Sequence, residues 1–167
     1  RVGERGSVVI VIRQLGKSKY NCSLLIDEGQ GADVKIFGLF GKFEAETRGN
    51  HVVVRDIEPS ELRTLETAAA RFEQVPEEIY EGCMYAKTIE ADAEKYGVLL
   101  IRFVVDLDLK RLPIHQHAHS SRKVVVLTGS GQFHFINPMN RQHECVSVEK
   151  GSFVSFSKGL WHTFTTS

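Results

Sequence analysis

The stretch Lys123–Ile136, which reads KVVVLTGSGQFHFI, indicates the fold most directly. A run of β-branched residues is followed by a glycine-containing turn and then by a second run in which apolar and polar residues alternate. This order is typical of two short strands joined by a tight turn. The segment therefore predicts a strand–turn–strand unit and places the chain among β-rich proteins.

Short runs with the same character lie on both sides of this unit. They are Ser7–Arg13, Tyr20–Asp27, Val34–Phe40, Lys42–Thr47, His51–Arg55, Gly97–Leu109, Cys145–Val148, Ser152–Phe156 and Trp161–Thr166. Glycine turns separate several of these runs, so the first part of the chain is expected to form a meander of short strands.

The period changes in the middle of the chain. From Pro59 to about Gln74, apolar residues recur at helical spacing, which predicts a helix. Pro76 could open a second short helix, and the acidic residues between 90 and 94 suggest an exposed loop. We expect one mostly β domain, with N-terminal strands in 1–58, a helical and loop segment in 59–96 and further strands in 97–167.

Composition limits the classes of partner. The 167 residues include 21 Lys+Arg and 21 Asp+Glu, so the formal net charge is zero. Binding to nucleic acid through bulk phosphate attraction is therefore not expected, and neither is a polybasic membrane anchor. No apolar run approaches the roughly 20 residues that cross a bilayer, and no signal peptide is recognisable. Three scattered cysteines without a CxxC pair fit buried thiols in a reducing, cytoplasmic compartment.

Histidine is distributed unevenly. Of seven histidines, six lie at or after position 115. In an extended segment, His115, His117 and His119 leave the same face, and two successive imidazoles can reach one cation. The third ring lies about 7 Å further on, so any remaining ligand must come from another strand. His162, after a turn near the end of the chain, is a candidate. His134 alternates with two phenylalanines and either lies outside or lines a pocket.

Two spaced patterns in this region resemble the motifs of the cupin family. In the first, His115-Gln116-His117 is followed by four residues, Arg122, six residues and Gly129. In the second, Gly151 is followed by Gly159 and, after two more residues, by His162. Arg122 occupies the position where the family has a metal-binding glutamate, and the resemblance covers about 70 residues.

The resemblance implies a jelly-roll β-barrel with a metal inside its mouth. By position, it implies that His115, His117 and His162 are the metal ligands, with His119 as an alternative ligand. The ion would be a divalent transition metal such as Fe, Zn, Ni or Mn. Arg122 would then hold the carboxylate of a substrate, and His134 and Trp161 would line the substrate pocket. No catalytic residue is identified.

The first functional hypothesis is a metal-dependent enzyme of oxygenase, isomerase or lyase type that acts on a small anionic molecule. A three-histidine dioxygenase is one form of it. An alternative is a non-catalytic cupin module that binds a small effector or sugar and has a degenerate metal site. A third possibility is a surface histidine cluster, in which His162 would lie far from His117. Family analogy also suggests a homodimer.

Overall fold

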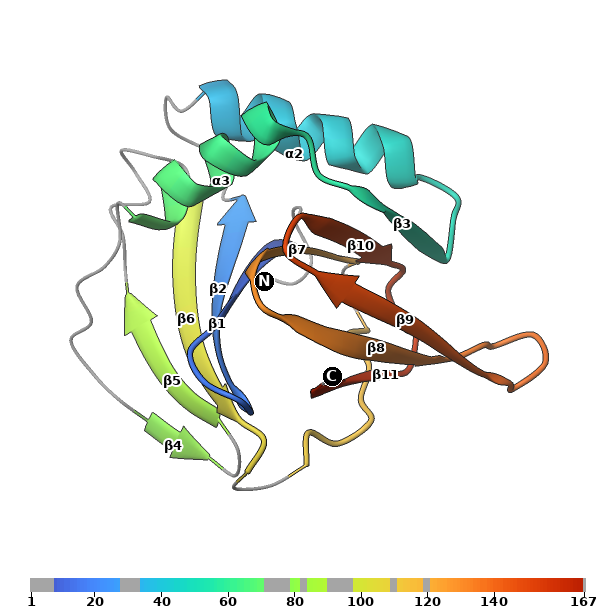
Figure 1. Ribbon diagram of the computed structural model, residues 1–167. Helices are drawn as coiled ribbons and strands as arrows, with labels where there is room; N and C mark the ends of the chain where they lie inside the picture. Colours follow the sequence, from blue (N-terminus) through green and yellow to red (C-terminus); the bar gives the residue numbers. More distant parts are fainter. Residues whose placement is uncertain are drawn as a thin grey trace.

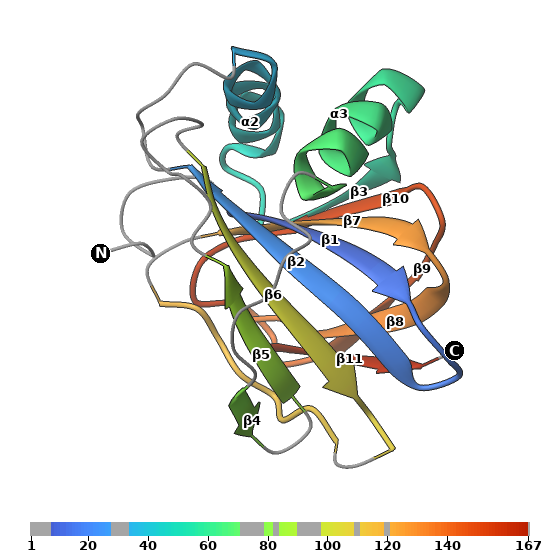
Figure 2. The same cartoon turned by 90° about the vertical axis from the view of Figure 1, so that its left-hand side faces the viewer.

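The protein consists mostly of β-structure, as the sequence predicts. The computed structural model describes residues 8–27, 34–70, 79–81, 84–89, 98–108, 111–118 and 121–166. Helices α2 (Val34–Thr47) and α3 (Pro59–Ala70) lie together on one face of a large sheet, and a small sheet lies on the other side (Figures 1 and 2). Neither of these two helices has the length and hydropathy needed to span a bilayer.

The large sheet has eight strands. Their order is β3 (Val52–Asp56), β10 (Ser152–Phe156), β7 (Arg122–Thr128), β1 (Val8–Gln14), β2 (Lys19–Asp27), β6 (Val98–Asp106), β5 (Met84–Ile89) and β4 (Ile79–Glu81). The small sheet has the order β11 (His162–Thr166), β8 (Ser130–Ile136) and β9 (His143–Glu149). Strands β1 and β7 pair in parallel, and all the other recorded pairs are antiparallel.

The expected β-rich character is confirmed, whereas a closed barrel is not found in the described part of the chain. The large sheet ends at β3 and β4, and the small sheet ends at β11 and β9. Strands from both the N-terminal and the C-terminal parts of the chain contribute to the large sheet. The jelly-roll form remains a prediction.

Two apolar cores lie on opposite faces of the large sheet because neighbouring residues of a strand point in opposite directions. In β7, Val125 and Leu127 pack with the helices, whereas Val124 and Val126 pack with residues of the small sheet. A strand buried on both faces has no polar alternation, which explains the continuous VVVL run. The second core contains Phe133, Phe135 and Phe156, as expected for apolar packing.

The same alternation determines the position of Lys123, although a lysine side chain ordinarily lies in solvent. Its side chain is fully buried on the helix side of β7. The ammonium forms an ion pair with Glu44 of α2 and donates to Ser121 Oγ at 2.7 Å. Because Arg122 is the adjacent residue in the strand, its side chain points to the opposite face, toward the small sheet.

The prediction of strands at Val34–Phe40 and Lys42–Thr47 is wrong, because both segments form the single helix α2. Ile36, Leu39, Phe40 and Phe43 are buried at helical spacing. Over a few positions, these apolar residues also alternate with residues of other types, and this pattern is typical of a strand. The glycines at 38 and 41 are exposed, and a Cβ atom there would meet nothing within 4 Å. They therefore weaken α2 without interrupting its buried face.

The predicted helix beginning at Pro59 is confirmed as α3, which is described to Ala70. The helix expected near Pro76 and the acidic stretch 90–94 lie outside the described residues. The middle segment also contains strands β4 and β5, which the sequence did not indicate. The expected strand at Gly97–Leu109 corresponds to β6.

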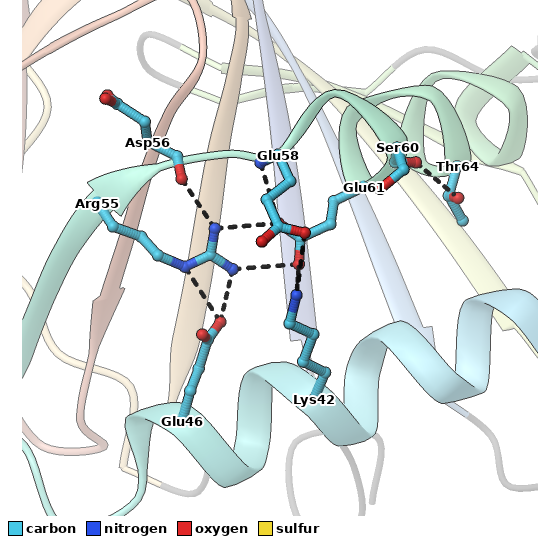
Figure 3. Close-up of polar contacts among 8 residues, drawn as sticks. All are labelled: Lys42, Glu46, Arg55, Asp56, Glu58, Ser60, Glu61 and Thr64. Atoms are coloured by element: carbon cyan, nitrogen blue, oxygen red, sulfur yellow. Dashed lines mark hydrogen bonds and ion pairs between the residues drawn. The ribbon is translucent and has the colours of Figure 1, made fainter.

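A polar cluster attaches both helices to β3 (Figure 3). Arg55 binds the Glu61 carboxylate through two nitrogens, at 3.0 and 3.2 Å, and its guanidinium lies 4.6 Å from the centre of the Phe153 ring. The Glu58 N–H donates to Glu61 Oε1 at 3.0 Å and caps α3. Burial acts to raise the pKa of Glu61, but the hydrogen bonds from Arg55 and Glu58 hold it below its usual value.

Candidate metal centre

Backbone pairing brings two distant segments together beside the start of β11. His115 N–H donates to His162 O at 2.9 Å, and His162 N–H donates to His115 O at 2.8 Å. The two residues therefore form an antiparallel β-bridge although they are 47 positions apart. Gly159 N–H donates to His117 O at 2.7 Å, which fixes the second histidine of the His-x-His pair against the turn before β11.

The three histidines His115, His117 and His162 form one compact group. Each offers one nitrogen, and these nitrogens lie within 4.8 Å of one another. The centroid of the His162 ring lies 4.3 Å from that of His115 and 5.0 Å from that of His117. This proximity contradicts the alternative in which His162 is remote from the other two.

Backbone carbonyls fix the proton positions of two rings. His115 Nδ1 lies 2.8 Å from Pro113 O, and His162 Nδ1 lies 2.8 Å from Leu160 O. A carbonyl only accepts, so each Nδ1 carries the hydrogen and donates it. The Nε2 lone pair of each ring is then free to bind a cation. This arrangement is common among metal-binding histidines, because the carbonyl both selects the tautomer and holds the ring.

The surroundings keep the rings of His117 and His162 uncharged. Burial, together with the charges of Arg122, His162 and His115, lowers the pKa of His117 to about 3. Burial also lowers the pKa of His162 to about 4, against the opposing effect of its bond to Leu160 O. Phe156 contributes to the burial, with its ring centroid 4.4 Å from that of His162. Neutral imidazole is the form that binds metal ions.

Arg122 lies beside this group as the first residue of β7. It pairs with Phe156 of β10, and its side chain shares the inter-sheet side of β7 with Val124. Its positive charge contributes to the lowered pKa of both His117 and His162. Arg122, five positions after His117 in the sequence, therefore lies close enough to the group to act on two of its rings.

The remaining candidates lie elsewhere. His134 points away from Phe133 and Phe135, and its ring contacts His143 and Thr165 on the outer side of the small sheet. Trp161 is 46% exposed, and its carbonyl accepts from Ile136 N–H. The structure thus does not bring either residue into the three-histidine group. His119, the alternative ligand, lies outside the described residues.

Sequence reasoning missed the carbonyls of Pro113 and Leu160, since backbone positions leave no residue-type signal. Each carbonyl precedes its histidine by two residues. The contribution of Phe156 to burying the site could have been predicted from the sequence, because alternation within Ser152–Phe156 places its side chain on the same side as Val154.

Three ring nitrogens from two adjoining segments could therefore hold a metal ion. Comparisons with protein-family models, with curated proteins and with solved structures gave no match.

Proposed function

We propose that this chain is a cupin-type metal-binding protein that holds one divalent transition metal ion through His115, His117 and His162. The observation that carries the proposal is the convergence of three imidazoles, two of which have their tautomers fixed by backbone carbonyls. Two facing sheets with the site at the start of β11 and β7 are compatible with a jelly-roll form of the domain.

The spacing of the group is compatible with such an ion. Metal–nitrogen bonds of about 2.0–2.1 Å in a tetrahedral site separate the nitrogens by about 3.3 Å. The nitrogens here lie within 4.8 Å of one another, so small rotations of the rings would bring them to the separation that a bound ion requires. Imidazole suits Zn, Fe and Ni, and Mn binds more weakly. A bound ion would act as a Lewis acid toward an oxygen of a small ligand.

The charge of the site favours an anionic ligand. Three neutral imidazoles leave the charge of the ion uncompensated, and Arg122 adds a further positive charge. A carboxylate would offset the repulsion between the ion and the positive charge of Arg122. A guanidinium binds a carboxylate through two parallel hydrogen bonds. We therefore propose a metal-dependent enzyme of oxygenase, isomerase or lyase type, acting on a small anionic substrate that Arg122 orients.

A second candidate function follows from the same arginine. A fixed positive charge beside the histidines opposes cation binding, so the pocket could hold an organic anion without metal. In this case the protein would be a non-catalytic module for a small acidic effector. The two candidates differ in whether anion binding depends on the metal.

Metal titration tests the first candidate. Chelator-treated protein is titrated with Zn(II), and separately with Fe(II) under anaerobic conditions, in a calorimeter. We expect a binding phase that disappears in His117→Ala and persists in His51→Ala, whose exposed ring contacts only Ser157 among the recorded partners. Equal binding by the wild-type protein and His117→Ala would refute the proposed centre.

A simple dicarboxylate, oxalate, then separates the two candidates. If oxalate binds only to the metal-loaded protein and Arg122→Gln weakens it, the metal-dependent function is supported. If oxalate binds equally well without metal, the second candidate is favoured.

A further inference from the structure

A second group of histidine and cysteine side chains lies on the outer face of the small sheet. His134 of β8 and Cys145 of β9 are direct cross-strand partners, so their side chains leave the same face. His143 precedes Cys145 by two positions in β9 and shares that face. We name these three residues the outer His–Cys group.

The two imidazoles are already in contact. His134 Nδ1 and His143 Nε2 lie 2.8 Å apart, and the ring centroids lie 4.9 Å apart in a stacked arrangement. A contact between two ring nitrogens holds one hydrogen, so at least one ring is neutral. Burial and the nearby His143 lower the pKa of His134, which keeps its ring in the form that binds metal ions.

Thr165 of β11 fixes the orientation of the central ring. Its Oγ1 lies 2.7 Å from His134 Nε2, on the side of the ring opposite His143. An imidazole held through one nitrogen presents the other in a defined direction, which is how outer partners support metal-binding histidines. Each of the three strands of the small sheet therefore contributes to this arrangement.

We infer that the outer His–Cys group is a second metal site, selective for a thiophilic divalent ion such as Zn(II). His134 and His143 would supply two nitrogens, and rotation of the Cys145 side chain would bring its thiolate toward them, with the thiol proton released to solvent. Zinc prefers this combination of nitrogen and sulfur, and three protein ligands leave a fourth position open. The thiol of Cys145 is exposed, in contrast to the burial expected from the sequence, and is accessible to an ion from solution. The rings must turn until both lone pairs face one ion, which opens the nitrogen–nitrogen distance from 2.8 Å to about 3.3 Å.

This inference does not depend on the proposed function. His134 points away from the inward-facing Phe133 and Phe135, whereas His162 contacts Phe156 in the inter-sheet core. The inner group also contains no sulfur. A spectroscopic signature of metal–thiolate bonding therefore distinguishes the outer site from the inner group.

Cobalt(II) is the probe for this site, because cobalt bound to a thiolate gives an intense charge-transfer absorption in the near ultraviolet that nitrogen ligands do not give. Reduced, metal-free full-length protein is titrated with Co(II) and then with Zn(II). We expect the absorption to reach its maximum when the outer site holds one Co(II) ion per chain. It should disappear when Zn(II) displaces this cobalt. It should be lost in Cys145→Ser, be reduced at least tenfold in amplitude in His143→Ala and persist in His117→Ala.

The controls keep the two sites apart. Absence of the charge-transfer absorption in the wild-type protein overturns the inference, as does its persistence in Cys145→Ser, since Cys22 or Cys83 would then be the ligand. Equal spectra for the wild-type protein and His143→Ala overturn it as well. Loss of metal binding at the inner group in His117→Ala, with the absorption unchanged, would support the outer site independently of the inner group.

Discussion

At the scale of single residues, local contacts determine what each histidine can do. His115 and His162 each donate through Nδ1 to a carbonyl two residues earlier, so Nε2 remains for an ion. His134 instead contacts side chains at both ring nitrogens. Residue type and spacing identified His115, His117 and His162 as a possible group, but the orientation of His134 depended on which face of β8 is covered.

Replacement of Arg122 tests the electrostatics of the inner group. In Arg122→Gln, we expect Zn(II) affinity to rise roughly tenfold, because a nearby positive charge that opposes the cation is removed. Affinity of the metal-loaded protein for oxalate should fall. Calorimetry measures both values, and Arg111→Gln, at an exposed arginine of the preceding segment, is the matched control. Unchanged Zn(II) and oxalate affinities would show that Arg122 does not act on the site.

The lowered pKa values predict how metal-free protein responds to acid. His117 and His162 have pKa values of about 3 and about 4 in the folded state, below the usual 6.5. As pH falls below about 6.5, the unfolded chain binds more protons, so stability is fully present above this pH and declines toward pH 4. Urea midpoints at pH 7 and pH 5 measure the loss. The loss should be smaller in His117→Asn, and an identical loss would contradict the assignment of the effect to this group.

At the scale of elements, the spacing of the apolar residues separated the correct predictions from the wrong ones. The runs that became β7, β8, β9, β10 and β11 alternate or are continuously apolar, and each was predicted close to its observed limits. Helix α2 was predicted as two strands because Val34–Phe40 and Lys42–Thr47 both alternate and flank Gly41. Tertiary packing of Ile36, Phe40 and Phe43 overrides these local preferences.

The exposed glycines of α2 provide a test of that explanation. We expect Gly38→Ala and Gly41→Ala each to stabilise the protein by about 0.5–1 kcal/mol, since alanine restricts the unfolded chain and nothing lies near the new methyl group. Differential scanning calorimetry should show a higher Tm. Gly131→Ala is the contrasting variant, because its Cβ would collide with the Phe164 ring, and its Tm should fall. A lower Tm for both α2 variants would contradict the helix.

The attachment of α3 depends on Glu61. Its carboxylate is 5% exposed and receives hydrogen bonds from Arg55 and from the Glu58 N–H. We expect Glu61→Gln to lower the free energy of unfolding by about 2 kcal/mol, the size of hydrogen bonds that involve charged groups. Glu58→Gln is the control, since this side chain is 61% exposed and its change should stay within about 0.5 kcal/mol. Equal effects of the two variants in urea denaturation would contradict the role of Glu61.

At the scale of the whole molecule, the sequence predicted a mostly β protein and a group of three histidines. It did not predict how the N-terminal strands join the C-terminal ones. The parallel pairing of β1 with β7 joins residues more than 100 positions apart, and no local pattern encodes such a partner. The burial of Lys123 was missed for the same reason, because it depends on α2 covering that face of β7.

The central claim is that one ion binds between His115, His117 and His162. Anomalous diffraction from crystals of the protein grown with Zn(II), recorded on both sides of the zinc absorption edge, tests it most directly. The account predicts a zinc peak about 2.0–2.1 Å from one nitrogen of each of the three rings. A map with no zinc peak between these rings, or with a peak that His162 does not contact, would contradict it.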